Sequence, residues 1–379
     1  MFENEIKSAV KHFEELLREQ LARQNKMEQA EPAKTYDADT KVTIGVCDGD
    51  GIGPIITKEA RRVLEALLCD EIDSGKTELK TIEGLTIENR LEKGEAVPSD
   101  VLAEIKKCDV LLKGPTTTPK GGSMESANVA LRRELDLFAN VRPVSVPELG
   151  IDWTFFRENT EGEYVLGSRG VALGDKLSMD FKVTTKNGTE RIARAAFEYA
   201  RANGKTNVAI VTKANIMKKT DGMFSEICHK VALDYPEITA EDWYIDIMTA
   251  NLVNEAIRSK FQVFLLPNLY GDIITDEAAQ IQGGVGTAGS SNSGDRYAMF
   301  EAIHGTAPRM IEEGLGDYAN PSSILKAAEM MLRHIGRKDA ANKLQKAMLE
   351  CESEGKFTVT GDKNGATCKQ FADYLISKL

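Results

Sequence analysis

The chain has 379 residues, of which 42% are hydrophobic and 28% are charged. This composition is typical of a globular protein with two or three domain-sized units. The formal net charge of −11 argues against a nucleic-acid-binding surface, and no apolar run approaches the roughly 20 residues of a membrane span. The composition therefore predicts no partnership with nucleic acid or membrane.

The cysteines and the N-terminus bear on location. The six cysteines are scattered, without a CxxC pair: Cys47, Cys69, Cys108, Cys228, Cys351 and Cys368. Such spacing is typical of reduced thiols rather than of a disulfide framework or a zinc site. The N-terminus has no apolar signal-peptide region and is too acidic for a typical transit peptide. These features predict a cytoplasmic location.

Residues 2–28 are predicted to form one amphipathic helix. Apolar side chains recur there at steps of three and four residues, at Phe2, Ile6, Val10, Phe13, Leu17 and Leu21. A polar stretch with Pro32 follows and is typical of a linker. The helix would pack on the core or on a second copy of the chain, and a solvated arm is the alternative.

The globular part begins at Lys41 with a strand, a glycine-rich turn and a helix. The strand is predicted at 42–46, the turn at 48–54, and the helix extends to Leu68. The turn superficially resembles a GxGxxG phosphate loop. Its glycines are spaced differently and Pro54 intervenes, so a Rossmann fingerprint is not met.

Further apolar strands alternate with helices along the chain. Strands are predicted at 110–115, 208–211 and 263–266, and helices include 190–203 and 324–333. Alternation of this kind predicts an α/β fold with a largely parallel sheet.

Four arginines, Arg132, Arg133, Arg142 and Arg157, occur close together in the sequence. Arginine is suited to bidentate recognition of carboxylates, so several arginines beside a divalent metal indicate a substrate with more than one carboxylate. Arg142 and Arg157 each end or follow an apolar strand-like stretch, which favours a functional role. For each arginine a surface salt bridge is the alternative.

Three further side chains carry acid–base or ligand chemistry. Tyr164 would serve as an acid, or else is a half-buried aromatic with a satisfied hydroxyl. Lys213, which follows the strand ending at Val211, would be a base if it is desolvated or near a metal, or else a solvated loop lysine. Asp246 lies among apolar residues, so it would be a buried carboxylate with a metal partner, or the polar position of an edge strand.

The apolar run 263–266 leads through Pro267 and Gly271 to Asp272 and Asp276. If a helix starts at this turn, both carboxylates lie on one face of its first turn. Two oxygen ligands at that spacing suit Mg²⁺ or Mn²⁺. Acidic residues that favour the dipole of a helix N-terminus are the alternative.

The loop 304–309 is rich in small residues and would wrap a nucleotide, although such loops are common. Taken together, these segments resemble the isocitrate/isopropylmalate dehydrogenase family of β-decarboxylating dehydrogenases, most closely its isocitrate branch. The resemblance extends from Lys41 to the C-terminus, and residues 1–40 lie outside it. It rests on five motifs: GDGIGP at 49–54, RENTEGEY at 157–164, KANIMK at 213–218, NLYGDIITDEAA at 268–279 and HGTAP at 304–308.

The resemblance implies a fold of two α/β domains that share a mixed sheet, which is not a Rossmann fold. It implies an N-terminal helical extension and linker at 1–40 and a discontinuous cofactor-binding domain of 41–137 plus 283–379. A small domain at 138–282 would hold the dimer interface and the metal aspartates. The family builds each site across a dimer, so we expect a homodimer with shared active sites or a higher homo-oligomer.

Family roles follow by matching motifs. Arg132, Arg142 and Arg157 would hold the carboxylates of a small tricarboxylate. Ser126 and Asn128 would hydrogen-bond the distal carboxylate of isocitrate, where isopropylmalate enzymes carry apolar residues. Tyr164 and Lys213 would be the acid–base pair, and the metal ligands would be Asp246, Asp272 and Asp276. Lys213 and Asp246 would come from the partner subunit. The implied cofactor contacts are Thr117, Thr118, His304, Gly305, Thr306, Ala307, Arg309 and Asn320.

The implied reaction is the oxidative decarboxylation of isocitrate to 2-oxoglutarate and CO₂, a step of the tricarboxylic acid cycle, with reduction of NAD or NADP. Lys213 would help to remove the hydroxyl proton, and Tyr164 would return a proton to carbon after CO₂ leaves. A 3-isopropylmalate or homoisocitrate dehydrogenase is an alternative. An alternative of another class is a non-catalytic regulatory subunit, which tends to lose the catalytic side chains that this chain retains.

The resemblance leaves the choice of nicotinamide cofactor open. Relatives that use NAD usually have an aspartate shortly after HGTAP, whereas NADP enzymes have Lys-Tyr there and a Tyr and an Arg near the C-terminus. This chain has Arg309-Met310, and Gly361 and Gly365 correspond to the two later positions. Arg309 would pair with a 2′-phosphate, or else with Glu312 or Glu313. The other three NADP contacts are missing, which slightly favours NAD.

Overall fold

The computed structural model describes residues 2–29, 33–119, 124–167, 169–284 and 288–379. The chain forms two compact units. Unit 1 comprises Met1–Pro32, Phe138–Asn140 and Val144–Ala278, and unit 2 comprises Ala33–Leu137, Val141–Pro143 and Ala279–Leu379. No helix in the described ranges has the length and apolar character that crossing a bilayer requires.

Unit 1 is built on a run of neighbouring strands, and their order is β4 (Ala139–Val146), β5 (Ile151–Glu158), β10 (Val263–Leu266), β8 (Asn207–Thr212) and β9 (Thr239–Tyr244). Strand β10 is parallel to both β5 and β8, and β8 is parallel to β9. The predicted strand 263–266 is confirmed at the same residues. The parallel pairing also confirms the α/β reading of this region.

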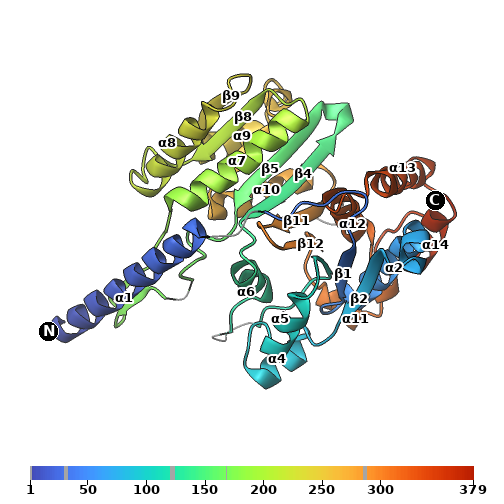
Figure 1. The fold of residues 1–379 in the computed structure, drawn as a ribbon, viewed down its shortest axis with the longest axis horizontal. Helices are drawn as coiled ribbons and strands as arrows, with labels where there is room; N and C mark the ends of the chain where they lie inside the picture. Colours follow the sequence, from blue (N-terminus) through green and yellow to red (C-terminus); the bar gives the residue numbers. More distant parts are fainter. Residues whose placement is uncertain (1, 30–32, 120–123, 168, 285–287) are drawn as a thin grey trace. The chain divides into compact units, whose positions relative to one another are not determined.

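Aromatic and aliphatic side chains from β5 and β10 form the core of unit 1. The rings of Phe155 and Phe264 stack with their centroids 4.3 Å apart, and Trp153 meets Phe264 edge-on at 5.7 Å. Helix α7 (Lys186–Ala202) packs on β5, β10 and β8. It also lies against α8 (Thr220–Ala232), as Figure 1 shows. The hydroxyl of Thr185 caps α7 by accepting a hydrogen bond from the Gly188 amide at 3.1 Å.

The remaining elements of unit 1 are shorter, apart from the N-terminal helix. They are α1 (Glu3–Glu28), η1 (Pro147–Leu149), β6 (Val171–Leu173), β7 (Leu177–Met179), α9 (Ile245–Leu252), η2 (Arg258–Lys260) and α10 (Asn268–Ile281), whose last residues fall in unit 2. The predicted N-terminal helix is confirmed. It packs on unit 1 through the buried Leu16, and α1 contacts α7 (Figure 1) and β6. The apolar stripe from which the helix was predicted does not form the packed face, because Ile6, Val10, Phe13, Leu17 and Leu21 are exposed.

Unit 2 contains a mixed sheet, in the order β2 (Thr77–Ile82), β1 (Val42–Cys47), β3 (Val110–Lys113), β12 (Ala298–Ala302) and β11 (Gly289–Ser293). The pairs β1–β2, β1–β3 and β3–β12 are parallel, whereas β11 and β12 are antiparallel. The largely parallel sheet predicted from the sequence therefore includes an antiparallel strand here, as the family resemblance implies.

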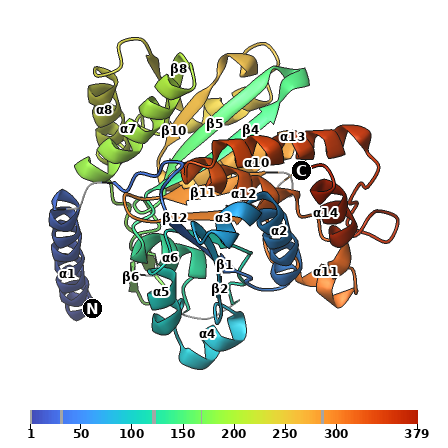
Figure 2. The same ribbon diagram turned by 45° about the vertical axis from the view of Figure 1, so that its right-hand side comes forward.

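Helices cover the sheet of unit 2 and complete its core. Helix α12 contacts β11 and β12 and lies against α13, and α14 packs on α2 (Figure 2). The helices of this unit are α2 (Gly53–Leu67), α3 (Cys69–Asp73), α4 (Ile87–Lys93), α5 (Ser99–Ile105), α6 (Ala127–Glu134), α11 (Pro308–Glu312), η4 (Gly316–Tyr318), α12 (Ser322–His334), α13 (Lys338–Glu354) and α14 (Cys368–Ile376). The core between them is aliphatic, with Ile44, Ile56, Leu332 and Leu344 fully buried. All six cysteines, each of which lies in a described range, are free thiols.

The polar stretch after α1 is anchored where it is described, rather than being a free linker. Pro32 lies outside the described residues. Farther on, the Tyr36 hydroxyl donates to the Asp109 carbonyl oxygen at 3.3 Å. The buried guanidinium of Arg337 donates to the carbonyl oxygens of Asp37 and Thr40 at 2.8 and 2.7 Å. A buried guanidinium requires acceptors, and this segment supplies two of them.

Candidate active site

In unit 1, Arg157 and Tyr164 converge on the carboxylate of Asp272. Arg157 lies near the end of β5 and is 1% exposed. Its Nη1 forms an ion pair with Oδ1 of Asp272, and the Tyr164 hydroxyl donates to Oδ2 at 2.7 Å. The guanidinium also lies over the Tyr164 ring, 5.3 Å from its centroid. The arrangement joins a cation, a phenol and a carboxylate, which is suited to handling an anionic substrate and a proton.

Helix α10 begins at Asn268, directly after Pro267, and not at the Gly271–Asp272 turn. Its first turn contains no acidic residue, so the helix-dipole interpretation of the aspartates is wrong. Asp272 and Asp276 still share a face, one helical turn apart, and Asp276 is exposed. The start is earlier than predicted because Pro267 fixes the backbone at the end of β10 and leaves Asn268 as the first helical residue.

Gly271 makes room for the arginine. A Cβ atom at this position would lie 2.6 Å from Cγ of Arg157, closer than real Cβ contacts allow. The glycine in the NLYGD sequence therefore lets α10 pass close to the end of β5, and this approach delivers Asp272 to Arg157.

Lys213 and Asp246 pair with each other. Lys213 follows β8, and its Nζ lies 2.5 Å from Oδ1 of Asp246. The hydrogen bond from Lys213 is the main cause that lowers the pKa of Asp246. The backbone amide of Lys213 donates to Asp221 at 2.7 Å, and this fully buried carboxylate also pairs with Lys182 at 2.6 Å. Asp221 therefore holds the backbone that carries Lys213.

The expectation that Asp246 is buried or on an edge strand is wrong. Asp246 lies in the first turn of α9, and its side chain is 67% exposed. The apolar neighbours misled the prediction because Met248 turns inward while Ile247 remains 47% exposed. Among the described residues, no three His, Cys, Asp or Glu side chains are grouped to hold a metal. The structure thus brings Lys213 to Asp246 and, as a distinct group, Arg157 and Tyr164 to Asp272.

In unit 2, Arg132 is held by a buried carboxylate. Arg132 is 9% exposed on α6, and its Nη2 donates to Oε1 of Glu301 at 3.2 Å. Nζ of Lys113 lies 3.1 Å from the other oxygen, and Asn292 donates to Oε1 at 2.8 Å. Burial alone would raise the pKa of Glu301, but the charges of Lys113 and Arg132 outweigh it and lower the pKa to about 2. The ionised Glu301 fixes the position of Arg132.

The other predicted substrate residues are found on two elements. Ser126 immediately precedes α6, is half-buried, and makes no capping hydrogen bond to that helix. Asn128 accepts a hydrogen bond from the Thr116 hydroxyl at 3.1 Å and lies one helical turn before Arg132. Arg142 is buried on β4. Asn128 and Arg132 therefore present an amide and a cation on one face of α6.

Three loops of unit 2 meet where the cofactor residues are predicted. The carboxylate of Asp50 accepts from the Thr117 amide at 2.7 Å, and the Ile52 amide donates to the Thr306 carbonyl oxygen at 3.1 Å. The hydroxyls of Thr117 and Thr306 are 3.4 Å apart. The structure thus brings the GDGIGP and HGTAP loops together with the loop after β3.

Glycines make this close approach possible. Gly49 and Gly51 have φ angles of +70° and +61°. Cβ atoms there would lie 2.2 Å from the Pro115 carbonyl oxygen and 2.1 Å from that of Thr306. The glycines of GDGIGP therefore serve packing of one backbone on another, which agrees with the absence of a Rossmann fingerprint.

The two ring nitrogens of the histidine in HGTAP differ in their surroundings. His304 Nδ1 donates to the Gly305 carbonyl oxygen at 3.0 Å, and burial lowers the pKa of the ring. The neutral ring then offers Nε2 as an acceptor, and this buried atom has no hydrogen-bond partner within the described part of the chain. Three residues later, Ala307 adopts a left-handed conformation with φ of 45° and directly precedes α11, which begins at Pro308.

The remaining cofactor candidates differ in their surroundings. Thr118 and Gly305 are exposed, whereas Asn320 accepts from the Ser322 amide at 2.9 Å. The Arg309 side chain is 87% exposed, and its Nε donates to Glu313 at 2.7 Å. This is the contact that the alternative interpretation of Arg309 expects. An exposed i,i+4 pair contributes little, so the cofactor role of Arg309 stays a prediction.

Comparison with known proteins identifies the family. The family model described as isocitrate/isopropylmalate dehydrogenase matches residues 43–375. The chain belongs to this family. Residues 1–42 precede the matched region, as the sequence motifs indicated. The confirmed fold is therefore the α/β fold of this family.

Similar proteins include a mitochondrial protein from Dictyostelium discoideum that is named as a regulatory component of isocitrate dehydrogenase [NAD]. It is 37% identical over 347 residues, covering 89% of this chain and 92% of the relative. An isocitrate dehydrogenase [NADP] from Rickettsia bellii is 37% identical over 357 residues, covering 90% of this chain and 70% of the relative. The crystal structure of isocitrate dehydrogenase from Methylococcus capsulatus has a TM-score of 0.79 at 34% identity, covering 89% and 99% of the two chains.

The motifs of this family do not point to every residue that organises the site. Asn268 accepts from both Nε and Nη2 of Arg157, at 3.0 and 2.6 Å, and was not singled out by the sequence. Glu301 was missed as well, although it is the one charge in the apolar strand Ala298–Ala302. A lone carboxylate in such a strand predicts a buried ion pair, so a signal was present.

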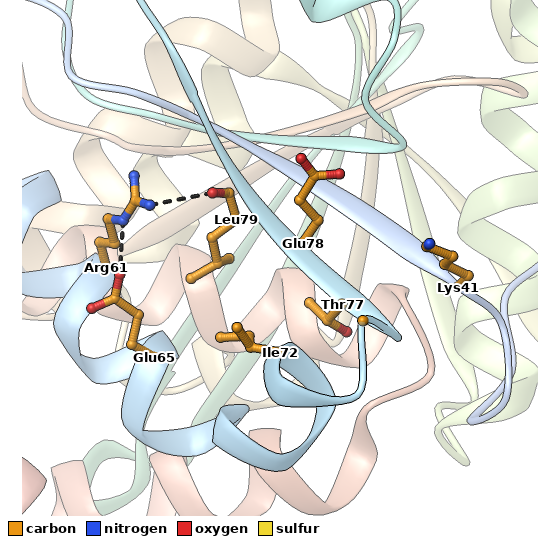
Figure 3. A pocket seen from close by; sticks show the side chains of 8 residues that line it. Lys41, Arg61, Glu65, Ile72, Thr77, Glu78 and Leu79 are labelled. Atoms are coloured by element: carbon orange, nitrogen blue, oxygen red, sulfur yellow. Dashed lines mark hydrogen bonds and ion pairs between the residues drawn. The ribbon is translucent and has the colours of Figure 1, made fainter.

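A pocket of about 350 Å³ lies elsewhere in unit 2, beside the edge strand β2 (Figure 3). It is lined by Lys41, Arg61, Glu65, Ile72, Gly75, Thr77, Glu78 and Leu79. Arg61 is already bonded to Glu65 at 2.9 Å and to the Leu79 carbonyl oxygen at 3.2 Å. None of the predicted site residues lines this pocket, and its arginine is satisfied locally. It is therefore no candidate for the family's chemistry.

Proposed function

We propose that this chain catalyses the oxidative decarboxylation of isocitrate to 2-oxoglutarate and CO₂, with a divalent metal and a nicotinamide nucleotide. The observation that carries the proposal is the convergence of Arg157 and Tyr164 on Asp272. It provides a carboxylate-binding cation, a proton donor and a hard oxygen ligand in one group. The names of relatives from both NAD-dependent and NADP-dependent enzymes support the reaction class.

Isocitrate is proposed as the substrate because of α6. Ser126 and Asn128 are polar where isopropylmalate enzymes are apolar, and Arg132 lies on the same helix with its guanidinium fixed by Glu301. A third carboxylate on the substrate would find hydrogen-bond donors and a cation here, whereas an isopropyl group would leave them unpaired. Homoisocitrate stays an alternative because it also carries three carboxylates.

Mg²⁺ or Mn²⁺ is proposed at Asp272 and Asp276, with Asp246 contributed by a partner subunit. The carboxylates of a single chain supply only part of this proposed metal site. Two oxygen donors lie one helical turn apart, and the third carboxylate is engaged with Lys213 instead. When bound, the metal would polarise the substrate hydroxyl and adjacent carboxylate, and the nucleotide would supply the hydride acceptor.

The proton transfers are assigned to Lys213 and Tyr164. Lys213 is positioned by its backbone hydrogen bond to Asp221. After its ammonium has lost a proton to solvent or a neighbouring group, the neutral amine would accept the substrate proton. Tyr164 points its hydroxyl at Asp272, at the site where the carbon product would be reprotonated. We propose that Tyr164 and Lys213 of each site come from two different copies of the chain, in a homodimer or a higher homo-oligomer.

NAD is slightly favoured as the cofactor. Arg309 is engaged with Glu313 and is largely exposed, and the other three NADP contacts are missing. The relatives are named for either cofactor, so this preference rests on the loop and on the two positions near the C-terminus, Gly361 and Gly365. The free cysteines support the proposal of a reducing compartment such as the cytoplasm.

A second candidate is a regulatory component without its own turnover, because one similar protein is named as such. The retention of Tyr164, Lys213 and all three aspartates argues against it. The deciding experiment measures turnover of isocitrate, isopropylmalate and homoisocitrate by the purified full chain, with NAD or NADP and with or without Mg²⁺ or Mn²⁺. Isocitrate turnover that stops on chelation is expected. No turnover of any substrate, restored by a homologous second chain, would favour the regulatory role.

A further inference from the structure

Helix α1, which precedes the family region, docks on unit 1 along much of its length. Leu16 is 1% exposed, and the Phe13 ring lies 5.2 Å from that of Phe181. The carboxylate of Glu19 accepts two hydrogen bonds from Arg169, at 2.5 and 2.7 Å. An apolar contact and an ion pair at separate points fix both the rotation and the position of the helix.

Near its C-terminal end, α1 delivers Arg23 to the RENTEGEY segment, residues 157–164. Nη1 of Arg23 lies 3.1 Å from Oε1 of Glu161, and Nη2 donates to the Thr160 hydroxyl at 2.9 Å. The side chains of Arg23 and Glu161 are 22% and 4% exposed. Arg18, on the same helix, differs because its pair with Glu14 is exposed and local. Arg23 therefore makes the long-range polar contact that a surface pair does not make.

Glu161 joins this contact to the predicted substrate arginine. Its carboxylate also accepts from the amide and hydroxyl of Thr185, at 2.8 and 2.5 Å. Its carbonyl oxygen accepts from Asn268 at 3.0 Å, and the amide oxygen of Asn268 accepts from Arg157. A continuous series of hydrogen bonds therefore leads from Arg23 through Glu161 and Asn268 to Arg157.

Arg23 supplies part of the positive charge that compensates two buried carboxylates in this segment. Glu158 and Glu161 are both 3% exposed and close together, since Glu158 accepts from the Glu161 amide at 2.6 Å. Burial and then the charge of Glu161 raise the pKa of Glu158 to about 7, while Arg191 and Arg23 oppose the rise. Without Arg23, two buried carboxylates would share less compensating charge, and the segment would rearrange to solvate one of them.

We propose that α1 is a positioning element for the active site, in which Arg23 acts through Thr160 and Glu161 to hold Arg157 in place. This inference rests on the proposed function, because the role of Arg157 toward substrate is proposed there. Arg23 touches no reacting atom in this scheme. The helix lies outside the region matched to the family model, residues 43–375.

The test compares full-length Arg23→Ala, Arg23→Gln and Arg23→Lys with Arg18→Ala as the matched control. Hydrogen exchange of the 158–164 amides is measured first, because it needs no substrate. Arg23→Ala is expected to lose protection there, Arg23→Lys to retain most of it, and Arg18→Ala to match wild type. Steady-state kinetics then follow. Arg23→Ala is expected to raise KM for isocitrate about tenfold, the equivalent of one lost charge-assisted hydrogen bond, with a smaller change in kcat.

Unchanged exchange and unchanged KM in Arg23→Ala would overturn the proposal, as would equal effects in Arg18→Ala. Lost protection without a rise in KM would also overturn it, because α1 would then dock without positioning Arg157. If Arg23→Ala fails to fold, Arg23→Gln takes its place, because glutamine keeps a hydrogen-bond donor but lacks the charge. Its hydrogen exchange and its KM are then compared with wild type in the same way. Wild-type enzyme that does not turn over isocitrate would reject the proposed function alone, since the exchange comparison still decides whether Arg23 orders the segment.

Discussion

The Nζ atom of Lys213 lies 2.5 Å from Oδ1 of Asp246, so the proposed base and a proposed metal ligand are paired with each other within one chain. Asp272, another proposed metal ligand, is paired instead with Arg157 and with the proposed acid Tyr164. Each chain therefore carries two distinct groups of site residues. This is the arrangement expected if a complete site draws one group from each of two subunits.

A mixing experiment tests the sharing of sites. Lys213→Met and Tyr164→Phe should each lower kcat by about a hundredfold or more, the usual loss for an acid–base group. If sites are shared, dissociating and reassociating the two inactive variants together creates hybrids with one intact site. Half of the dimers are hybrids, so about a quarter of wild-type activity should return. Mixing that restores nothing, although mass spectrometry detects hybrids, would show that each chain builds its site alone.

The distal group of the substrate is tested at Ser126. Ser126→Leu should reduce kcat/KM for isocitrate about tenfold to a hundredfold, because a lost hydrogen bond to a carboxylate costs about 1–3 kcal/mol. Activity with isopropylmalate should change less. Ser126→Ala serves as the control, since it removes the hydroxyl without filling the space. Equal losses on both substrates in steady-state assays would show that this position does not read the distal group.

The cofactor loop is tested at Arg309. Arg309→Asp should lower kcat/KM with NADP about tenfold to a hundredfold, the value of one charge-assisted contact to a 2′-phosphate, and should maintain or improve activity with NAD. Glu313→Gln is the matched variant, because it removes the carboxylate that pairs with Arg309. It should leave kcat/KM with NADP unchanged or raise it. Parallel losses with both cofactors would mean that Arg309 has only its local role on α11.

Glu301 gives a pH-dependent prediction. Its pKa in the folded state, about 2, is below the ordinary 4.5. Its ionised form therefore adds stability above about pH 4.5, and this contribution is lost as the pH falls toward 2. At pH 6, Glu301→Gln should lower the free energy of unfolding by about 3–5 kcal/mol, because Lys113 and Arg132 would remain buried without their carboxylate.

Urea unfolding at pH 6 and pH 3 measures both values. The difference between Glu301→Gln and wild type should shrink at pH 3, because the unfolded chain then binds a proton at this carboxyl that the folded protein largely does not bind. Glu104→Gln is the control, since that carboxylate pairs with Lys80 and Lys107 at the surface and should change stability little. A difference that is constant between the two pH values would mean that the pKa of Glu301 is the same in the folded and the unfolded protein.

Local patterns in the sequence predicted much of the fold. The strand Val263–Leu266 was placed correctly because four apolar residues are bounded by Pro267. The N-terminal helix was also found from its periodicity. Local patterns failed at Asp246, where apolar neighbours indicated burial although the helix turns the carboxylate outward. Periodicity alone does not separate a short strand from a helical turn.

The candidate site was predicted through motifs, and its long-range partners were not. Arg157, Tyr164 and Asp272 were identified individually, but their convergence depends on β5 and α10, which are over 100 residues apart in the chain. Asn268 was missed because an asparagine after a proline is equally typical of a helix start. The contact of Arg23 with Glu161 spans 138 residues and Arg23 lies outside the motifs, so only the folded structure reveals the contact.

The glycine contacts of GDGIGP limit how this protein can diversify. Any side chain at Gly49 or Gly51 would collide with a backbone carbonyl on another loop, and a carbonyl has no rotamer with which to move aside. Gly49 and Gly51, in the proposed nucleotide-binding region, are therefore closed to gradual change. New cofactor preferences would have to arise near Arg309 instead, where side chains face solvent and substitutions cost little stability. A mutant library aimed at cofactor preference should therefore vary the residues near Arg309 and leave Gly49 and Gly51 unchanged.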